Sequence, residues 1–329
     1  MKITKKNLDT YLKGSQFLAT GGGLPLQMHK KIFTQIIRDD SEISPKDLRS
    51  FSDEDYLISA YGVGDPSCIP DGFDRAVVRA FQKYKDLTQK EITGIIPGEI
   101  GAEGLSFLIS RITGIPVADA DLVGGRAAPE IQLDVFSVYD LPITPTLLIA
   151  INGKSIYLEG QFTAQDIEKI SRDFFDLNGS SGLLIGYGIS AKDFARYAIT
   201  GSLTLALQIG QVLDRDDMQS LTTICGGSII STTIVKKVEL KSRGGFLSGE
   251  IICADGIMQV KNENIQFEDQ NGQLYVAPDI LMFINGRGEP IHNTLMKKYI
   301  GKTVRLIHIP AIGYWATKKA RALWHDIIK

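Results

Sequence analysis

The stretch YLISAYGVGDP, residues 56–66, decides the fold of this chain. It begins with an apolar run over residues 56–61 and ends in two glycines, an aspartate and a proline. A short apolar run closed by turn residues predicts a buried strand. The segment that follows, residues 73–84, carries small and apolar side chains at helical spacing, so we expect a helix directly after this strand and turn.

The same order of elements recurs twice further along the chain. Residues 91–97 are strand-like and residues 104–112 helical, and then residues 115–118 are extended and residues 128–139 helical. Three strand–turn–helix units predict an α/β fold, with a short parallel sheet and crossover helices.

In the second half of the chain the pattern changes. Residues 147–158 are typical of a hairpin with an Asn-Gly turn, and residues 163–175 of a helix. A segment rich in Ile, Val and Thr, residues 229–240, is followed by several shorter strand signals. We therefore expect an N-terminal α/β domain and a β-rich C-terminal domain, over residues 1–175 and 176–329, with the helices near 163–213 able to pack with either.

Charge and composition narrow the class of protein. The 36 basic and 38 acidic residues give a net charge of −2, so we expect no nucleic-acid partner. Three scattered cysteines argue against a disulfide framework and fit a reducing compartment. The N-terminus lacks the apolar core of a signal peptide, and the longest apolar stretch, residues 141–151, is too short to span a bilayer. These features predict a cytoplasmic protein without a membrane partner, and they leave a homo-oligomer open.

Candidate site residues lie in three loops at the carboxyl ends of the predicted parallel strands. Ligands bind at that edge of open α/β sheets because loops and helix N-termini converge there. Each loop places glycine beside a carboxylate, so backbone amides could hold an anion while the carboxylate orients a nitrogen or a water. The loops contribute Gly62, Gly64 and Asp65, then Glu99, and then Asp119, Asp121 and Arg126.

Asp119 and Asp121 form a D-x-D pair directly after an extended segment. At strand spacing their side chains point the same way, and the two like charges would raise one pKa. That arrangement suits a general acid or base, or a ligand of a hard cation. The alternative is that both aspartates stay ionised and cap the following helix.

Arg126 and Glu130 are four residues apart at the start of the predicted helix. They could form a surface ion pair, or Arg126 could hold a substrate carboxylate with its planar guanidinium. The triplet Gly21-Gly22-Gly23 follows a predicted helix, so it is either a helix C-cap or a ligand-binding loop.

The sequence does not identify a cofactor. No GK[ST] follows the glycine triplet and no GxGxxG follows a predicted strand, so there is no nucleotide motif. The four histidines show no HxH or HExxH spacing, so no zinc site is predicted. A divalent metal held by carboxylates stays open.

Several motifs together resemble the family once known as DUF917, now labelled S-methyl thiohydantoin desulfurase-like and linked with hydantoinase/oxoprolinase systems. In the first half they are ATGGG (19–23), YGVGDP (61–66), PGEIG (97–101) and ADADLVGGRAAPEIQ (118–132). In the second half they are the glycine turn at 244–249, KNENI (261–265), APDIL (277–281) and HIPAIGYW (308–315). The resemblance implies two domains and hydrolytic removal of sulfur from a thiohydantoin-type ring.

Taken together, the residues and the resemblance predict a small-molecule hydrolase acting on a cyclic amide or thioamide. Asp119 or Asp121 would be the base and Glu99 would orient water or a ring N–H. The substrate contacts would come from Gly21, Gly22, Gly23, Gly62, Gly64, Asp65, Arg126 and Glu130. Two alternatives remain: a non-catalytic protein that binds a small ligand, and a metal-dependent amidohydrolase using Asp119, Asp121 and Glu99 as ligands.

Overall fold

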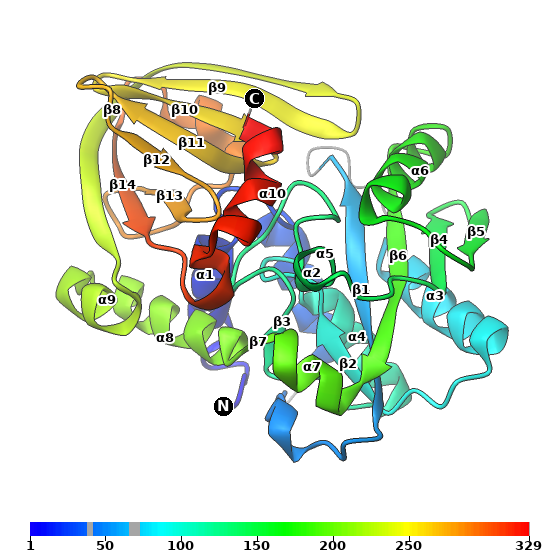
Figure 1. The fold of residues 1–329 in the computed structure, drawn as a ribbon. Helices are drawn as coiled ribbons and strands as arrows, with labels where there is room; N and C mark the ends of the chain where they lie inside the picture. Colours follow the sequence, from blue (N-terminus) through cyan, green and yellow to red (C-terminus); the bar gives the residue numbers. More distant parts are fainter. Residues whose placement is uncertain (38–41, 66–72, 329) are drawn as a thin grey trace.

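The computed structural model describes residues 1–37, 42–65 and 73–328. Pro66 of the first loop and Cys68 lie outside the described residues. The chain forms an α/β half and a β-rich half that pack side by side, with the C-terminal helix between them (Figure 1). This confirms the predicted fold class.

The sheet of the first half has five strands in the order β2-β1-β6-β4-β5. Strands β1 and β2 run parallel, whereas the β1–β6, β6–β4 and β4–β5 pairs are antiparallel. The bounds are β1 Tyr56–Gly64, β2 Gly94–Pro97, β4 Thr146–Ala150, β5 Ser155–Leu158 and β6 Ser181–Ser190. Six of the nine residues of β1 are buried because helices cover both faces of this sheet.

The prediction of three parallel strands is wrong in detail. Residues 115–118 form no full strand: Val117 makes an isolated parallel bridge to Ile95 and Ala118 makes one to Lys46. Strand β6 pairs with β1 on its other side. Strand β6 follows residue 175, so the first sheet includes residues from both predicted domains. The position of the domain boundary stays a prediction.

Helices cover both faces of the first sheet, and alternate residues of its strands contribute to opposite faces of the core. Leu147 and Ile149 pack toward α1, α2, α3, α4 and α8, whereas Leu148 packs toward α5, α6 and α7. The bounds are α1 Leu8–Leu18, α2 Leu26–Ile36, α3 Phe73–Thr88, α4 Gly104–Thr113, α5 Val135–Tyr139, α6 Ala164–Asp176, α7 Ala191–Tyr197 and α8 Ser202–Asp214.

The helix predicted over residues 128–139 is also wrong in its extent, because only α5 is helical there. Carboxylates from elsewhere in the fold bind the backbone N–H groups upstream of it. Ala128 donates to Glu99 and Ile131 donates to Glu168. A backbone whose donors are already bound by side chains has little to gain from a helical turn.

The second half is a seven-stranded antiparallel sheet in the order β12-β11-β10-β9-β8-β14-β13, which confirms the predicted β-rich domain. Its strands are β8 Ser228–Arg243, β9 Phe246–Cys253, β10 Gly256–Lys261, β11 Glu263–Asp269, β12 Leu274–Val276, β13 Ile280–Ile284 and β14 Thr303–Ile309. The remaining elements are the β3–β7 pair (Ala120–Asp121 and Ile199–Thr200), α9 Met218–Cys225, α10 Lys318–Ile328, and the 3-10 turns Leu48–Ser50, Asn293–Tyr299 and Gly313–Ala316.

Helices α1 and α8 bring the N-terminus against the segment that precedes the second sheet. A Cβ on Gly14 would lie 1.7 Å from the Ala206 carbonyl oxygen, and one on Gly210 would lie 1.8 Å from the Thr10 oxygen. Glycine at both positions therefore allows the two backbones to touch. None of the described helices is both long and apolar enough to cross a bilayer.

Candidate functional site

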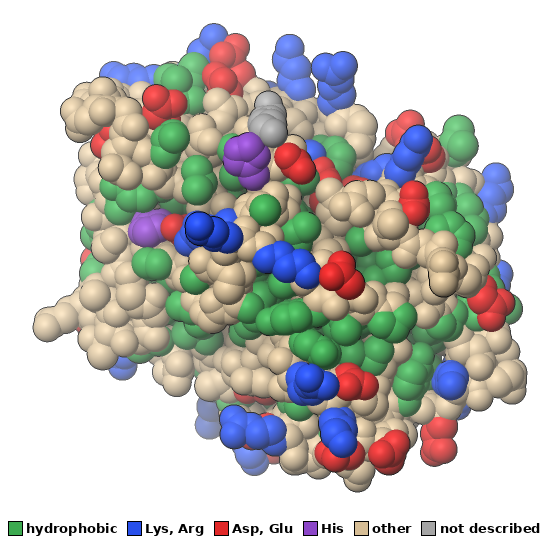
Figure 2. All heavy atoms as spheres, viewed as in Figure 1, with side chains coloured by type: hydrophobic (Ala, Val, Ile, Leu, Met, Phe, Trp, Pro, Cys, Tyr) green, Lys and Arg blue, Asp and Glu red, His purple; other side chains and the backbone are tan. Residues whose placement is uncertain are grey.

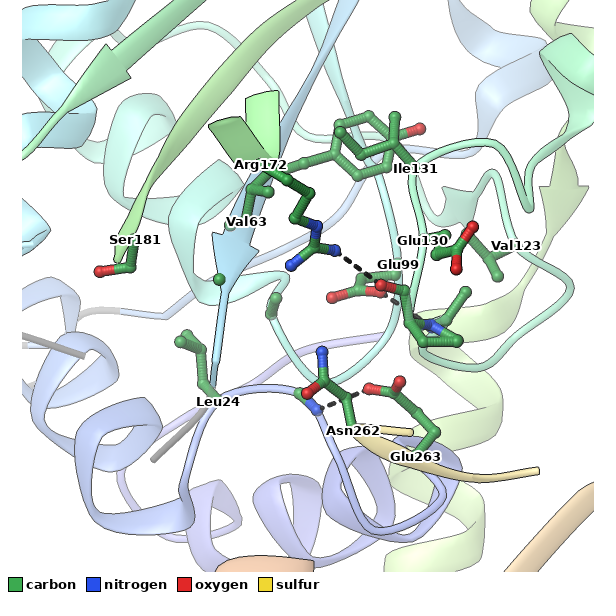
Figure 3. A pocket seen from close by; sticks show the side chains of 17 residues that line it. Leu24, Val63, Glu99, Val123, Glu130, Ile131, Arg172, Ser181, Asn262 and Glu263 are labelled. Carbon is green, nitrogen blue, oxygen red and sulfur yellow. Dashed lines mark hydrogen bonds between the residues drawn. The ribbon is translucent and has the colours of Figure 1, made fainter. Parts of the chain in front are cut away.

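A cavity opens where the first sheet meets the turn between β10 and β11. The carboxylate cavity, as we call it, is lined by Glu99 from the loop after β2, by Glu263 and Asn262 from the second sheet, and by Arg172 of α6. Figure 3 shows these four side chains pointing toward the same space from different elements. The site thus draws on both halves of the chain.

Glu99 lies just beyond the end of β2 and keeps part of its surface open to the cavity. Its Oε2 accepts a hydrogen bond of 3.0 Å from the Ala128 backbone N–H. Burial, reinforced by the negative charge of Glu263, raises the pKa of Glu99 well above its ordinary value. Both effects shift Glu99 toward its protonated form relative to an exposed glutamate.

Glu263 is the first residue of β11 and is almost completely buried. Its Oε1 accepts a bond of 3.3 Å from the Gly23 N–H, while its Oε2 is buried with no partner in the described part of the chain. Burial raises the pKa of Glu263 to about 7, and the positive charge of Arg126 acts in the opposite direction. A buried carboxylate oxygen without a partner is costly, so it is a strong candidate for contact with a ligand.

Neighbouring residues hold Glu263 in place through a close backbone approach. A Cβ on Gly22 would lie 2.0 Å from Glu263 Oε1, so only glycine fits beside this carboxylate. The preceding residue, Asn262, has a positive φ of 58° and is tied by its Oδ1 to the Leu247 N–H at 2.8 Å. Its amide nitrogen is directed into the cavity in Figure 3, where it can donate to a bound molecule.

Arg172 closes one side of the cavity. Its guanidinium donates to Glu168 at 2.7 Å, to the Pro129 carbonyl at 2.7 Å and to the Gly245 carbonyl at 2.9 Å. It also lies 3.9 Å from the centre of the Phe246 ring. Arg172 thereby joins α6, the loop before α5 and the β8–β9 turn around the cavity.

The end of β1 gives the cavity an open strand edge. Pairing with β2 stops at Ala60, whereas pairing with β6 continues to Gly64. Alternate residues of an antiparallel strand direct both N–H and C=O away from the partner. Over residues 61–64, no strand among the described residues pairs with the N–H and C=O groups that point away from β6. Gly62 and Gly64 of this segment line the cavity.

The D-x-D aspartates do not line this cavity. Asp119 accepts hydrogen bonds from the Leu203 and Thr204 N–H groups, at 3.0 and 3.2 Å, and from the Thr204 hydroxyl. Asp121 is fully buried and accepts bonds of 2.9 to 3.0 Å from the N–H groups of Val123 and Gly125. Burial raises the pKa of Asp121 to about 7, although these N–H groups lower it. Both side chains fix backbone turns.

Arg126 is also bound within the protein. It donates to the Ala127 carbonyl at 2.9 Å, the Asp279 carbonyl at 2.8 Å and the Thr20 hydroxyl at 3.3 Å, and it stacks 4.3 Å from the Trp324 ring centre. Burial lowers the pKa of Arg126 to about 10. The helical pair with Glu130, one of the two alternatives for Arg126, does not form, because residues 126–130 are not helical.

Glu130 does line the carboxylate cavity, where its side chain binds Lys261 and Gln132. Of the glycine triplet, Gly23 lines the cavity, Gly22 lies against Glu263, and Gly21 lies against the Asn293 amide. Asp65 is buried at the end of β1 and is not among the lining residues.

Two family models match the chain along almost its whole length. The S-Me-THD-like N-terminal domain matches residues 6–160, and the S-Me-THD-like C-terminal domain matches residues 163–325. The chain belongs to the S-Me-THD-like family. This confirms the resemblance drawn from the motifs.

Other comparisons bear on the fold. No protein of curated function matches this S-Me-THD-like chain. A crystal structure of a protein from Chromobacterium violaceum, from the Northeast Structural Genomics Consortium, is similar with a TM-score of 0.80 and 18% identity. The match covers 100% of this chain and 96% of that one. At this identity the likeness shows a shared fold.

Sequence reasoning missed Glu263, Asn262 and Arg172 as site residues. The first two lie in the KNENI stretch, which contributed only to the resemblance, and Arg172 lies within a helix that showed no catalytic motif. A clue was available in the close pairing of Asn262 and Glu263 at a strand boundary. No periodicity, however, brings that boundary next to Glu99.

Asp119, Asp121 and Glu99 are not gathered as metal ligands. Across the described ranges, no three His, Cys, Asp or Glu side chains form a group that could hold a metal ion.

The face in Figure 2 shows acidic and basic side chains interspersed, with hydrophobic side chains gathered across its middle. The carboxylate cavity is the candidate site of this S-Me-THD-like chain, because it brings Glu99 and Glu263 together beside Asn262.

Proposed function

We propose that this S-Me-THD-like protein is a hydrolase that acts on a cyclic amide or thioamide of the thiohydantoin type. The observation that carries the proposal is the pairing of Glu99 and Glu263 in one cavity, with the Oε2 of Glu263 buried and without a partner in the described part of the chain. Two carboxyl groups whose pKa values are raised at one site can exchange protons near neutral pH.

The two carboxyl groups would take different roles. Glu263 is the base, because the nearby positive charge of Arg126 favours its ionised form. Glu99 is the acid, because burial and the charge of Glu263 favour its protonated form. This division follows the rule that an acid and a base in one site have environments that push their pKa values apart.

The reaction on an S-alkylated thiohydantoin can be written with these two groups. Glu263 takes a proton from water as the oxygen bonds to the ring carbon that carries sulfur. Glu99 gives its proton to the sulfur as the C–S bond breaks, and the sulfur leaves as a thiol. The remaining hydroxyl proton moves to the ring nitrogen, which leaves a hydantoin, and proton exchange with water restores the pair.

The rest of the cavity suits a ring with adjacent N–H and C=O groups. Such a ring can hydrogen-bond to the open edge of β1 at Gly62 and Gly64, as another strand would. The amide nitrogen of Asn262 is placed to donate to a ring oxygen or to charge that develops during attack.

The proposal is tested by incubating the protein with S-methyl thiohydantoin, the unmethylated thiohydantoin and hydantoin. We expect release of thiol and appearance of hydantoin from the first ring, measured with a chromogenic disulfide and by chromatography. Glu263→Gln should lower kcat/KM by about 10²- to 10⁴-fold. The control is Glu268→Gln, an exposed glutamate on the same strand, which should change it less than twofold. Equal rates for Glu263→Gln and the control would refute the assignment.

A second function rests on the same groups. The Oε2 of Glu263, which has no partner among the described residues, and the amide nitrogen of Asn262 would also hold a cyclic amide without reacting with it. In that case the same rings would raise the melting temperature of the protein and be recovered unchanged. Turnover by the wild type decides between the two functions.

A further inference from the structure

A second cavity borders residues 123–125, which follow the D-x-D pair in the chain. It is lined by Leu18 of α1, Leu205 of α8, Ile280 of β13 and Trp315, and Cys225 lies at the end of α9 beside it. Val123 contributes to the walls of both cavities. We refer to the second one as the apolar cavity.

The walls of the apolar cavity carry no charge. Among the described residues, its lining includes no Asp, Glu, Lys, Arg or His, and the Cys225 thiol already donates to the Leu221 carbonyl at 3.2 Å. Transfer of an ion into such surroundings would be strongly unfavourable, so a ligand here must be uncharged.

The size of the cavity admits a substituted ring. Its volume is about 360 Å³. An engineered apolar protein cavity of about 150 Å³ is enough to bind benzene. The apolar cavity therefore has room for an aromatic or branched aliphatic group with a substituent.

One polar atom of the lining residues could orient a bound ligand. The indole N–H of Trp315 is buried and has no hydrogen-bond partner in the described part of the chain. A Cβ on Gly124 would lie 2.4 Å from this nitrogen, and Gly124 also lines the cavity. Buried indole N–H groups usually find an acceptor, which a molecule in the cavity could supply in place of the neighbouring Tyr314 hydroxyl.

The mouth of the cavity is apolar and reaches the surface. Ile224 and Ile312 both line the cavity and are 39% and 61% exposed. Large aliphatic side chains exposed at the rim of a concave apolar site are typical of an entry for a small molecule.

We propose that the apolar cavity is a binding site for an uncharged small molecule that carries an aromatic or branched aliphatic group and one hydrogen-bond acceptor. The acceptor binds the indole N–H of Trp315, and the hydrocarbon part packs against Leu205, Ile280 and Ile309. The site is separate from the proposed hydrolytic site, so it stands or falls without that function.

The proposal is tested with three probes of similar size: acetophenone, toluene and benzoate. Ligand-detected NMR titration measures the dissociation constant of each for the full-length protein. We expect acetophenone to bind most tightly, toluene at least threefold more weakly because it lacks an acceptor, and benzoate not at all. Absence of acetophenone binding, or equal binding of benzoate, would overturn the proposal.

Two substitutions on one helix locate the binding. Leu205→Phe fills the cavity and should weaken acetophenone binding at least tenfold. Leu207→Phe makes the same change at a half-buried position of α8 that does not line the cavity, and it should leave binding within twofold. Trp315→Phe should abolish the preference of the protein for acetophenone over toluene. Equal binding by the Leu205 and Leu207 variants would show that acetophenone binds elsewhere.

Discussion

Two pairs of acidic residues can be compared in this protein: Asp119 with Asp121, and Glu99 with Glu263. All four oxygens of the aspartate pair accept hydrogen bonds from the protein, mostly from backbone N–H groups. In the glutamate pair, Oε2 of Glu263 accepts none from the described residues. Burial raises the pKa of both Asp121 and Glu263 to about 7, so the pKa does not distinguish the two pairs. The two pairs differ in that Oε2 of Glu263 has no partner among the described residues and that Glu99 and Glu263 line a cavity.

The largest expected effect concerns the glutamate pair as a unit. Glu99→Gln and Glu263→Gln should each lower kcat/KM on S-methyl thiohydantoin by about 10²- to 10⁴-fold. The double variant should be no slower than the slower single variant, because removal of either proton-transfer group already disables the pair. Rates are compared by thiol release. Losses that add in free energy would instead mean that the two groups act independently.

A smaller effect, on stability, is expected for the aspartate pair. Asp121→Asn places an amide NH₂ where a carboxylate oxygen now accepts from Val123 or Gly125, so two donors face each other. We expect a loss of about 2–3 kcal/mol in the free energy of unfolding, measured in urea. Glu263→Gln serves as the contrast and should lose less than about 0.5 kcal/mol, since one oxygen of this buried carboxylate has no partner among the described residues. A stable but inactive Asp121→Asn would return the D-x-D pair to the mechanism.

This contrast also explains what the sequence could predict. An apolar run such as residues 56–61 is apolar because the strand is buried, so the local pattern of side chains is enough to predict it. The strand and the helix that follows it form as expected. The order of strands depends on which distant segment pairs with an edge. Strand β6 pairs with β1 through long-range contacts that local spacing does not encode.

The candidate site shows the same division. Glu99 was identified because it follows a strand beside glycine, which is a local signal. Asp119 and Asp121 carry an even clearer local signal, yet their oxygens bind the backbone around them. Glu263 reaches the cavity only because the β10–β11 turn packs against the glycine triplet, a tertiary contact. Local patterns therefore locate loops that carry carboxylates, and tertiary packing decides which of these carboxylates face a cavity.

The pH dependence of stability tests the glutamate pair by a different route. Burial raises the pKa of Glu263 from 4.5 to about 7. The folded state thus holds its proton more tightly than the unfolded state, so this contribution is fully present below pH 4.5 and is lost as the pH rises through 7. We expect Glu263→Gln to reduce the fall in unfolding free energy between pH 5 and 8 by on the order of 2 kcal/mol. An unchanged slope would mean that Glu263 is ionised in the folded protein throughout this range.

The smallest expected effect concerns Asp119, whose carboxylate caps α8 from a different segment. The residue at the start of that helix, Gly201, has no side chain to cap it, and Asp119 accepts from the Leu203 and Thr204 N–H groups in its place. Asp119→Ala should therefore cost about 1 kcal/mol of unfolding free energy. Thr163→Ala, which removes the local cap of α6, is the matched comparison and should cost a similar amount. If Asp119→Ala instead abolished turnover at unchanged stability, the distinction between the two acidic pairs would fail, because a carboxylate with every oxygen bonded would then be reactive.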